Sequence, residues 1–326
     1  MTQALLEVKD LNIKFHTNRG LVTAVSNLSF RIQQGETVAL VGESGCGKSV
    51  TSLSIMGLNK PSVCQVEGRI WFKNKDLNQL NDKEMRSIRG QEISMIFQET
   101  MSSLNPVLTI GQQIMEVFKI HTYLSTHECW SKTILLLTQV GIPHADSVMR
   151  QYPHQLSGGM KQRAMIAMAM ACSPDLLIAD EPTTALDVTI QAQILDLMNE
   201  MKLRSHTSIL LITHDLGVVA EMADRVMVMY YGDLVEETDT LTLFTNPKHP
   251  YTVGLLNSVP KIDSINQRLS SIEGHVPVLG EVTTGCPFRF RCKDAHDRCK
   301  AEKPPLIQTG KQAVRCWLYE NEELAI

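Results

Sequence analysis

A glycine-rich loop between a predicted strand and a predicted helix places the strongest constraint on how this chain folds. Residues 37–41 form a short apolar run typical of a buried strand, and the glycine-rich stretch 42–47 follows at once. Together with Lys48 and Ser49 the loop fits G-x-x-x-x-G-K-[ST], a pattern whose backbone N–H groups converge on phosphate oxygens. A helix should begin at Lys48 and direct the positive end of its dipole at the phosphate. The pattern therefore predicts an α/β fold with a nucleotide site.

The residue types of this loop each suit a role in holding nucleotide phosphate. The glycines let the backbone approach the phosphates, Lys48 reaches the β- and γ-phosphates, and the Ser49 hydroxyl ligates Mg²⁺. A glycine turn without nucleotide is the alternative, which the flanking strand and helix disfavour. The residues that we expect to contact the nucleotide are Gly42, Glu43, Ser44, Gly45, Cys46, Gly47, Lys48, Ser49 and Val50.

A second buried-strand pattern, residues 176–179, ends at a pair of carboxylates. Asp180, at the end of the strand, can hold Mg²⁺ directly or through water. Glu181, one residue further, can act as general base on an attacking water. In isolation, an acidic N-cap at the end of a strand explains the pair about as well. Downstream of a phosphate loop, the pair indicates hydrolysis of the nucleotide.

Residues 156–162, which read LSGGMKQ, lie at the start of a predicted helix over 160–172. Ser157, Gly158 and Gly159 would present a hydroxyl and accessible N–H groups there, which suits an anion. A chain with one phosphate loop has no need of a second anion site, so the pattern makes sense if each nucleotide is held between two chains. An ordinary helix N-cap followed by glycines is the simpler alternative, favoured in isolation.

These motifs, in this order, resemble the ABC transporter ATPase family over residues 5 to about 243. The resemblance also rests on Gln98 after an apolar strand, on the segment Ala185-Leu186-Asp187 and on His214. It implies a P-loop ABC ATPase fold, with a RecA-like core around a mainly parallel sheet. It also implies an N-terminal antiparallel β subdomain and an inserted helical subdomain at about residues 100–172.

The family resemblance further implies roles for single residues. Gln98 would sense the γ-phosphate and Mg²⁺, and Asp187 would communicate across a dimer of cassettes. His214 would contact the γ-phosphate and hold the catalytic geometry. Phe15 resembles the position that stacks on adenine, with Phe30 as a rival and a plain core phenylalanine as the alternative. The expected Mg²⁺ ligands are Ser49, Gln98 and Asp180.

Near residue 246 the regular apolar pattern weakens, and prolines and cysteines become frequent. We place a domain boundary there, with an ABC ATPase domain at residues 1–245 and a small C-terminal extension at 246–326. The extension contains His249-Pro250-Tyr251-Thr252 and Gly285-Cys286-Pro287-Phe288. These segments resemble the ATP-binding subunits of oligopeptide, dipeptide and nickel importers, and the dipeptide and oligopeptide type is nearest in overall impression.

The resemblance implies an ATPase that couples ATP hydrolysis to uptake of dipeptides or oligopeptides across the bacterial cytoplasmic membrane. Import of nickel or another small solute by the same family is the first alternative. A soluble ABC ATPase of translation or DNA repair is less favoured, because the sequence shows neither a second cassette nor a coiled-coil insertion. A nucleotide-binding regulator without turnover is disfavoured by the presence of Glu181 and His214.

The same resemblance implies partners. Two ATPase chains, commonly non-identical, would pair and serve two transmembrane permease subunits and an extracytoplasmic peptide-binding protein; a homodimer is the alternative. The formal net charge of −4 gives no reason to expect nucleic acid. The sequence shows no run of about 20 apolar residues and no signal-peptide pattern. We therefore expect a peripheral protein on the cytoplasmic face of the inner membrane.

Four of the eight cysteines crowd the extension with the spacing C-x5-C-x6-C-x16-C. Such a segment has little apolar material of its own, and a metal centre would cross-link it. Four thiolates suit zinc or an iron–sulfur cluster, and structural zinc usually shows tighter C-x₂₋₄-C pairs. The subfamily resemblance points to [4Fe–4S], with unligated thiols as the third possibility. The expected ligands are Cys286, Cys292, Cys299 and Cys316.

A fifth cysteine, Cys46, stands inside the phosphate loop beside Lys48. Converging N–H groups, a helix N-terminus and a neighbouring lysine favour the thiolate form of cysteine. We therefore expect Cys46 to react with maleimide in the nucleotide-free protein, and Mg-ATP to protect it. A tolerated small residue without a redox role is the alternative, and the preferred one for its biology.

Overall fold

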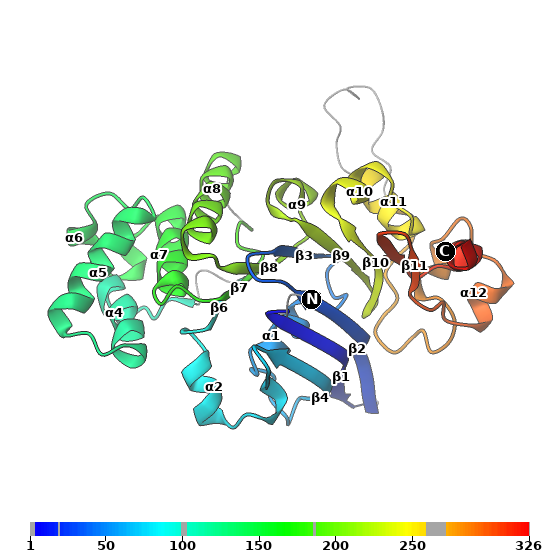
Figure 1. The fold of residues 1–326 in the computed structure, drawn as a ribbon, viewed down its shortest axis with the longest axis horizontal. Coiled ribbons are helices and arrows are strands. Elements are labelled where there is room, and N and C mark those ends of the chain that lie inside the picture. Colours follow the sequence, from blue (N-terminus) through cyan, green and yellow to red (C-terminus); the bar gives the residue numbers. More distant parts are fainter. Residues whose placement is uncertain (1–3, 19, 99–102, 185–186, 259–271, 326) are drawn as a thin grey trace. The chain divides into compact units, whose positions relative to one another are not determined.

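The computed structural model describes residues 4–18, 20–98, 103–184, 187–258 and 272–325 (Figure 1). The chain forms two compact units. The first comprises residues 1–5, 32–37 and 79–212, and the second comprises residues 6–31, 38–78 and 213–326. Strands and helices alternate along much of both units, which confirms the predicted α/β class.

The first unit contains three parallel strands, β6 (Ile93–Ile96), β7 (Leu176–Asp180) and β8 (Ser208–Thr213). Strand β7 pairs with both of the others, with Leu176 opposite Ile93 on one side and Ser208 on the other. Every residue of β7 and β8 is buried. These strands are apolar without alternation because parallel sheets are covered on both faces.

Helices make up most of the rest of this unit, as the sequence predicts for residues 100–172. Helix α7 begins at Gly158, two residues before its predicted start, because the Ser157 side chain accepts a hydrogen bond from the Met160 N–H and caps the helix. It ends at Met170, shortly before Pro174. The helices of this unit are α2 (Asp82–Ile88), α4 (Ile110–His121), α5 (Thr126–Gln139), α6 (Ala145–Val148), α7 (Gly158–Met170) and α8 (Val188–Ser205).

An antiparallel sheet opens the second unit, as predicted, in the order β2-β1-β4-β5. The sequence predicts short strands here, but β1 and β2 are 12 and 13 residues long. The alternation is interrupted because the β1–β4 register shifts between Lys9 and Asn12, where Asp10 has a φ of 51°. The strands are β1 (Leu6–Thr17), β2 (Gly20–Ile32), β4 (Cys64–Phe72) and β5 (Lys75–Asp76).

A second, mixed sheet of this unit joins distant parts of the chain. Strand β3 (Thr37–Val41) pairs parallel with β9 (Arg225–Tyr230), and β9 pairs antiparallel with β10 (Asp233–Asp239). Strand β10 also pairs with β12 (Gln312–Val314), which pairs with β11 (Ile307–Thr309). The apolar pattern of the sequence does not predict β10, β11 or β12. The helices of this unit are α1 (Lys48–Ile55), α9 (Leu216–Met222), α10 (Thr240–Thr245), α11 (Pro250–Asn257) and α12 (Asp297–Ala301).

The C-terminal extension shares the apolar core of the second unit. Tyr251 and Phe288 are buried in one cluster with Val41, Val228 and Tyr230 of the mixed sheet. The ring centroids of Tyr230 and Tyr251 lie 4.8 Å apart, and those of Tyr230 and Phe288 lie 5.2 Å apart. The extension is therefore ordered in part by packing on the sheet. Within the described ranges, no helix is both long and apolar enough to cross a membrane.

Candidate functional site

The phosphate loop, residues 42–49, lies between β3 and α1 in the second unit and depends on two glycines. A Cβ at Gly42, whose φ is 154°, would stand 2.2 Å from the Met229 carbonyl oxygen. A Cβ at Gly47, whose φ is 108°, would stand 2.9 Å from the Ala24 carbonyl oxygen. The loop is therefore pressed against neighbouring backbone at both ends, and only glycine fits.

Lys48 is buried, and its ammonium group lies within the loop. Its Nζ donates to the carbonyl oxygens of Gly42 at 2.7 Å and Glu43 at 3.0 Å. Ser49 follows in the first turn of α1, and among the described residues no side chain caps that helix. The N–H groups of a helix's first turn lack partners within the helix, so they can bind an anion. These features fit nucleotide phosphate with Mg²⁺.

The expectation that Cys46 is a reactive thiolate is wrong. The residue is 1% exposed, although its Sγ lies 3.7 Å from the Lys48 Nζ. Burial raises the pKa of the Cys46 thiol, and the smaller opposing effect of Lys48 does not compensate. Sequence alone placed the thiol next to a positive charge but gave no measure of its burial.

The predicted carboxylate pair occupies the end of β7 in the first unit. Asp180 is the last residue of the strand and is buried. Glu181 follows with a φ of 49°, and its N–H donates to the Ile212 carbonyl at 2.8 Å. A left-handed glutamate is unusual and costs free energy, and such strain concentrates at functional sites.

Two side chains hold the Glu181 carboxylate. The Gln98 Nε2 and the Thr184 hydroxyl both donate to its Oε2, each at 2.9 Å. The structure thus brings together Glu181, the predicted general base, and Gln98, which the family resemblance places at the γ-phosphate. Thr184 is not among the residues predicted from the sequence. Its only signal is a hydroxyl three residues after the glutamate, within the run Glu181-Pro182-Thr183-Thr184.

The candidate second anion site is also in the first unit. Ser157 is the N-cap of α7, so the simpler alternative describes its local role. Ser157 and Gly158 are both exposed, and nothing lies within 4 Å of the place where a Gly158 Cβ would stand. A Cβ at Gly159 would stand 3.3 Å from the Ile190 Cγ2. An exposed, uncrowded helix N-terminus remains suited to an anion from outside the chain.

A buried glutamine joins this helix to the carboxylate segment. Gln162 of α7 is fully buried, and its Nε2 donates to the Pro182 carbonyl, one residue after Glu181. Its Oε1 is buried and has no hydrogen-bond partner among the described residues. The sequence identifies Gln162 only as part of the motif. Its buried contact was not predicted, because the partner Pro182 lies 20 residues away.

The remaining predicted residues are placed as follows. Asp187 caps α8, its carboxylate accepting from the Ile190 N–H at 2.9 Å, while Ala185 and Leu186 lie outside the described residues. His214 directly follows β8 and is exposed. Phe15 on β1 is partly exposed, whereas its rival Phe30 on β2 is buried.

The predicted site residues are divided between the two units. The second unit contains the phosphate loop, Phe15 and His214. The first unit contains Gln98, Ser157, Asp180, Glu181 and Asp187.

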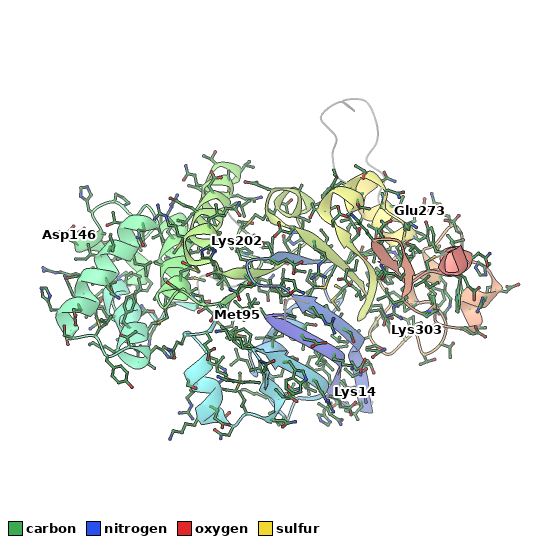
Figure 2. All side chains as sticks on the ribbon, viewed as in Figure 1. Lys14, Met95, Asp146, Lys202, Glu273 and Lys303 are labelled. Atoms are coloured by element: carbon green, nitrogen blue, oxygen red, sulfur yellow. The ribbon has the colours of Figure 1, made fainter. Side chains whose placement is uncertain are left out.

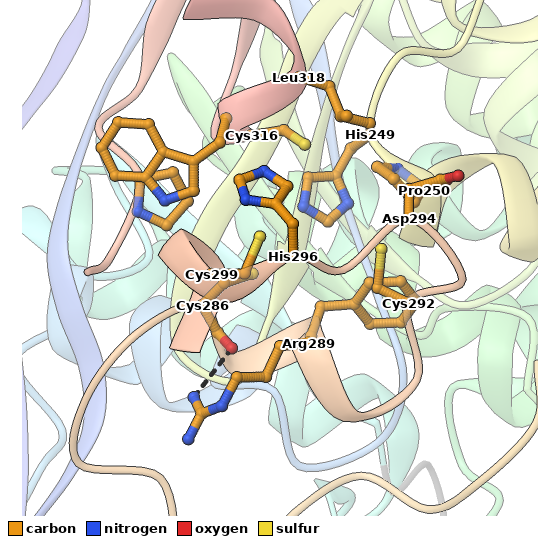
Figure 3. A pocket seen from close by; sticks show the side chains of 13 residues that line it. His249, Pro250, Cys286, Arg289, Cys292, Asp294, His296, Cys299, Cys316 and Leu318 are labelled. Carbon is orange, nitrogen blue, oxygen red and sulfur yellow. Dashed lines mark hydrogen bonds between the residues drawn. The ribbon is translucent and has the colours of Figure 1, made fainter. Parts of the chain in front are cut away.

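All four cysteines of the extension line one cavity, which we call the cysteine cavity (Figure 3). None of the eight cysteines, all of which lie in described ranges, forms a disulfide. The Cys286 N–H donates to the Cys299 carbonyl at 2.8 Å. A Cβ at Gly285 would stand 2.4 Å from that same carbonyl oxygen. Gly285, with a φ of 71°, thus allows the loop that carries Cys286 to meet helix α12, which carries Cys299.

The thiols of the cysteine cavity influence one another. The pKa of Cys286 is raised to about 11 and that of Cys316 to about 12, mainly by burial and to a smaller extent by neighbouring cysteines. His249, Asp294 and His296 also line the cavity. In the part of the chain that the structure describes, no group of three or more His, Cys, Asp or Glu side chains is arranged to hold a metal ion.

Two family models match the chain. The first, described as ABC transporter, matches residues 25–184. The second, described as oligopeptide/dipeptide transporter, C-terminal region, matches residues 235–299. The first match includes the phosphate loop and Glu181, and the second includes three of the four cysteines of the extension.

Curated relatives extend over nearly the whole chain. The oligopeptide transport ATP-binding protein AppD of Bacillus subtilis (strain 168) is 52% identical over 98% of this chain and 98% of its own length. The dipeptide transport ATP-binding protein DppD of the same organism is 51% identical over 98% of this chain and 96% of its own length. The oligopeptide transport ATP-binding protein OppD of Salmonella typhimurium is 46% identical over 98% of this chain and 95% of its own length.

Solved structures match the cassette part of the chain. The dimeric ATP-binding cassette MJ0796 in a post-hydrolysis state, bound to ADP and Pi, gives a TM-score of 0.65 at 27% identity. The match covers 72% of this chain and 98% of that one. The cbiO1 protein from Clostridium perfringens, part of the ABC transporter complex cbiONQ, gives a TM-score of 0.63 at 28% identity. That match covers 74% of this chain and 91% of cbiO1.

Proposed function

Since the chain belongs to the family of ABC transporter ATP-binding proteins, we propose that it drives the import of dipeptides or oligopeptides across the bacterial cytoplasmic membrane. The chain is an ATPase of the ABC type. The observation that carries peptide import is the match of residues 235–299 to the oligopeptide/dipeptide transporter C-terminal region, joined to an ATPase cassette in the same chain. Import of nickel or another small solute is the alternative.

We propose that hydrolysis proceeds by general base catalysis at Glu181. Lys48 and the phosphate loop hold the β- and γ-phosphates. The Glu181 carboxylate, oriented by Gln98 and Thr184, accepts a proton from the water that attacks the γ-phosphorus. The bond from the γ-phosphorus to the bridging oxygen breaks, which releases ADP and inorganic phosphate.

Further roles in the ATP site follow from the same proposal. Mg²⁺, when bound, neutralises charge on the β- and γ-phosphate oxygens. Phe15 stacks on adenine, and His214 contacts the γ-phosphate. Asp187 and the segment Ser157-Gly158-Gly159 act across a dimer, where the N-terminus of α7 meets the nucleotide of a second ATPase chain. The proposed Mg²⁺ ligands are Ser49, Gln98 and Asp180.

The proposed assembly contains a second ATPase chain, two transmembrane permease subunits and an extracytoplasmic peptide-binding protein, without nucleic acid. A non-identical partner chain is the preferred arrangement, with a homodimer as the alternative. We place the protein peripherally on the cytoplasmic face of the inner membrane. We also keep the division between an ATPase domain, residues 1–245, and the C-terminal extension, residues 246–326. The matched C-terminal family model supports a specialised extension.

An uptake experiment tests peptide import. Cells that lack the gene for this chain are supplied with a radiolabelled dipeptide, a labelled tetrapeptide or nickel-63. We expect the wild-type gene to restore uptake of at least one peptide, and the Glu181→Gln gene to restore none. Restored nickel uptake without peptide uptake would select the alternative solute.

For the cysteine cavity we propose a [4Fe–4S] cluster bound by Cys286, Cys292, Cys299 and Cys316. The donor chemistry supports it, since four thiols line one cavity and Cys₄ is the ligand set of such clusters. The described side chains are not yet arranged to hold a metal ion, so the proposal requires the thiols to turn toward one another when the cluster binds. The raised pKa values of Cys286 and Cys316 describe the thiols without a cation, and a bound metal centre stabilises thiolates. The residues Gly285 and Phe288 orient the loop that carries Cys286.

Anaerobic purification, with iron, sulfide and zinc analysis and a visible spectrum, tests the cluster. We expect a brown protein with about four irons per chain, lost in Cys292→Ser. Cys129→Ser, which removes a buried cysteine of α5 in the other unit, is the matched control and should keep the iron. Stoichiometric zinc without iron, or neither metal with four thiols open to alkylation, would exclude the cluster.

A further inference from the structure

Two side chains of the C-terminal extension hold the second residue of the phosphate loop, Glu43. Its backbone N–H donates to the Tyr251 hydroxyl at 2.9 Å. Its carboxylate accepts two hydrogen bonds from the Arg291 guanidinium, at 2.6 Å and 3.1 Å. Tyr251 and Arg291 lie 208 and 248 positions from Glu43 along the chain. The proposed hydrolysis chemistry uses neither of them.

The Arg291 guanidinium is fixed from several sides. Its side chain is 4% exposed. Its Nε donates to the carbonyl oxygen of Glu273 at 3.1 Å (Glu273 is labelled in Figure 2). The guanidinium lies 5.8 Å and 5.9 Å from the ring centroids of Tyr230 and Phe288. The hydrogen bonds to Glu43 raise the pKa of Arg291, so the side chain stays charged. A two-pronged, buried contact of this kind fixes geometry in a way that an exposed ion pair does not.

The Tyr251 hydroxyl is fixed by the core. The residue is 0% exposed, and its ring centroid lies 4.8 Å from that of Tyr230 and 5.5 Å from that of Phe288. Its backbone N–H donates to the His249 Nδ1 at 3.0 Å. The hydroxyl therefore has little freedom to follow a moving loop, and it holds the Glu43 N–H in one place.

Glu43 in turn bonds to the rest of the loop. Its carbonyl oxygen accepts from the Lys48 Nζ at 3.0 Å and from the Cys46 N–H at 3.3 Å. A shift of Glu43 would therefore move an acceptor of the catalytic-site lysine and the bond that shapes the middle of the loop.

We propose that Arg291 and Tyr251 are positioning residues of the phosphate loop, so that the affinity for nucleoside triphosphate depends on the C-terminal extension. The inference rests on the phosphate loop as the nucleotide site proposed above. Neither residue is assigned a contact with nucleotide; both act through Glu43. Because Arg291 precedes Cys292, which lines the cysteine cavity, one short segment serves both the cavity and the loop.

Calorimetric titration of the full-length chain with Mg-ATP and Mg-ADP tests the inference, together with thermal unfolding. Tyr251→Phe keeps the buried ring and removes the hydroxyl, and Arg291→Lys keeps the charge and removes the two-pronged contact. We expect each to weaken ATP binding about 3- to 10-fold, the effect of losing one hydrogen bond. In the assembled transporter the KM for ATP should rise while kcat is kept.

A matched control and a loop variant separate the possible results. Tyr319→Phe, whose hydroxyl instead donates to the Lys248 carbonyl at 2.9 Å, should bind ATP as the wild type does. Wild-type affinity in Tyr251→Phe and Arg291→Lys, with binding lost in Lys48→Ala, would overturn the positioning role and leave the phosphate loop intact. Unchanged affinity in Lys48→Ala would overturn the loop assignment itself. Equal losses of affinity in Tyr251→Phe and Tyr319→Phe would indicate general loosening and count against positioning.

Discussion

The phosphate loop and the cysteine cavity, both in the second unit, each depend on a closely packed glycine, but they are assembled from different parts of the chain. In each, a glycine with positive φ allows backbone to meet a carbonyl oxygen, Gly42 at Met229 and Gly285 at Cys299. The loop is one continuous segment of eight residues. The cavity draws its lining from residues 249 to 318. A continuous motif is recognisable in sequence, whereas a site built from separate loops depends on the core beneath it.

The two regions also differ in what completes them. Lys48 already has two carbonyl partners within the loop, so the loop holds its shape through backbone contacts. In the cavity, burial raises the pKa values of the Cys286 and Cys316 thiols, and Cys286 adds to the shift of Cys316. We therefore expect the proposed cluster to stabilise the cavity more than nucleotide stabilises the loop. The predictions below test this contrast.

The largest effect is expected at Glu181, the proposed general base. Glu181→Gln should keep ATP binding and lower hydrolysis by at least about 100-fold, because the attacking water loses its base. It should also trap a nucleotide-bound dimer, whereas Lys48→Ala should weaken binding itself. Steady-state ATPase rates and nucleotide titrations of the assembled complex measure both. Full turnover, with the partner chain inactivated in the same way, would remove Glu181 from the mechanism.

Glycine substitutions compare the two regions directly. Gly42→Ala and Gly285→Ala each place a Cβ within 2.5 Å of a carbonyl oxygen, so the backbone must move. We expect Gly42→Ala to lower ATP affinity at least about 10-fold, and Gly285→Ala to destabilise the extension by about 2–4 kcal/mol with metal content reduced. Calorimetry, thermal unfolding and metal analysis provide the readouts.

Matched glycines provide the controls for those substitutions. Gly45, in the same loop, and Gly310, in the extension, also have positive φ, but nothing lies within 4 Å of an added Cβ. Alanine there should cost about 1 kcal/mol from backbone strain alone. Losses at Gly45 and Gly310 as large as those at Gly42 and Gly285 would show that conformation, and not close approach, sets the cost.

A pH effect is expected in the extension. Burial lowers the pKa of His249 to about 3, helped by the nearby Arg315. The unfolded chain takes up a proton near pH 6.5 and the folded chain does not, so stability should fall as pH drops from 6.5 towards 3. The largest slope from this residue is about 1.4 kcal/mol per pH unit. Burial raises the pKa of Glu236, which acts in the opposite direction.

A His249 variant isolates that contribution. His249→Asn retains an N-cap acceptor for the Tyr251 N–H but does not titrate. Melting temperatures of both proteins between pH 7 and pH 5 should converge as pH falls, since only the wild type loses the histidine contribution. Parallel curves would mean that His249 does not contribute to acid sensitivity.

The smallest effect is expected at the surface of the extension. Lys300 and Asp297 form an exposed ion pair at 2.8 Å, three residues apart on α12. Lys300→Met should leave the melting temperature and the metal content unchanged within error, because exposed pairs contribute little. A clear drop in the melting temperature would mean that surface charges, in addition to the shared core, hold the extension.

The sequence predicted the phosphate loop and the Asp180-Glu181 pair because their chemistry lies in adjacent residues after buried strands. It did not predict β10, whose Glu236 is buried and accepts N–H groups from Lys248 and His249 at 2.8 Å. A charged residue in a short strand resembles a surface position until such tertiary partners are known. The hydrogen bonds that join Tyr251 and Arg291 to Glu43 were missed for the same reason. Thr184 is a local partner of Glu181, but no motif pointed to it.

Cys46 shows the converse error. The pattern correctly placed the thiol beside Lys48, but the direction of its pKa shift depends on burial, which no local pattern reports. Likewise, the spacing of the four extension cysteines predicted a shared site, but not that Phe288 joins it to the sheet core or that Gly285 lies against the Cys299 carbonyl. What sequence left out is in each case the depth and the long-range partners of a residue.

The pairing of β10 with β12 has a consequence for the chain as it is synthesised. Strand β10 ends at Asp239, and its partner begins at Gln312, more than 70 residues later. At about 5–20 residues per second, the ribosome takes roughly 4–15 s to complete that interval. Until then one edge of β10 has unpaired N–H and C=O groups that another nascent chain can join. We therefore expect that truncation before residue 307 produces aggregates during translation, which chaperones that bind exposed strand edges would reduce.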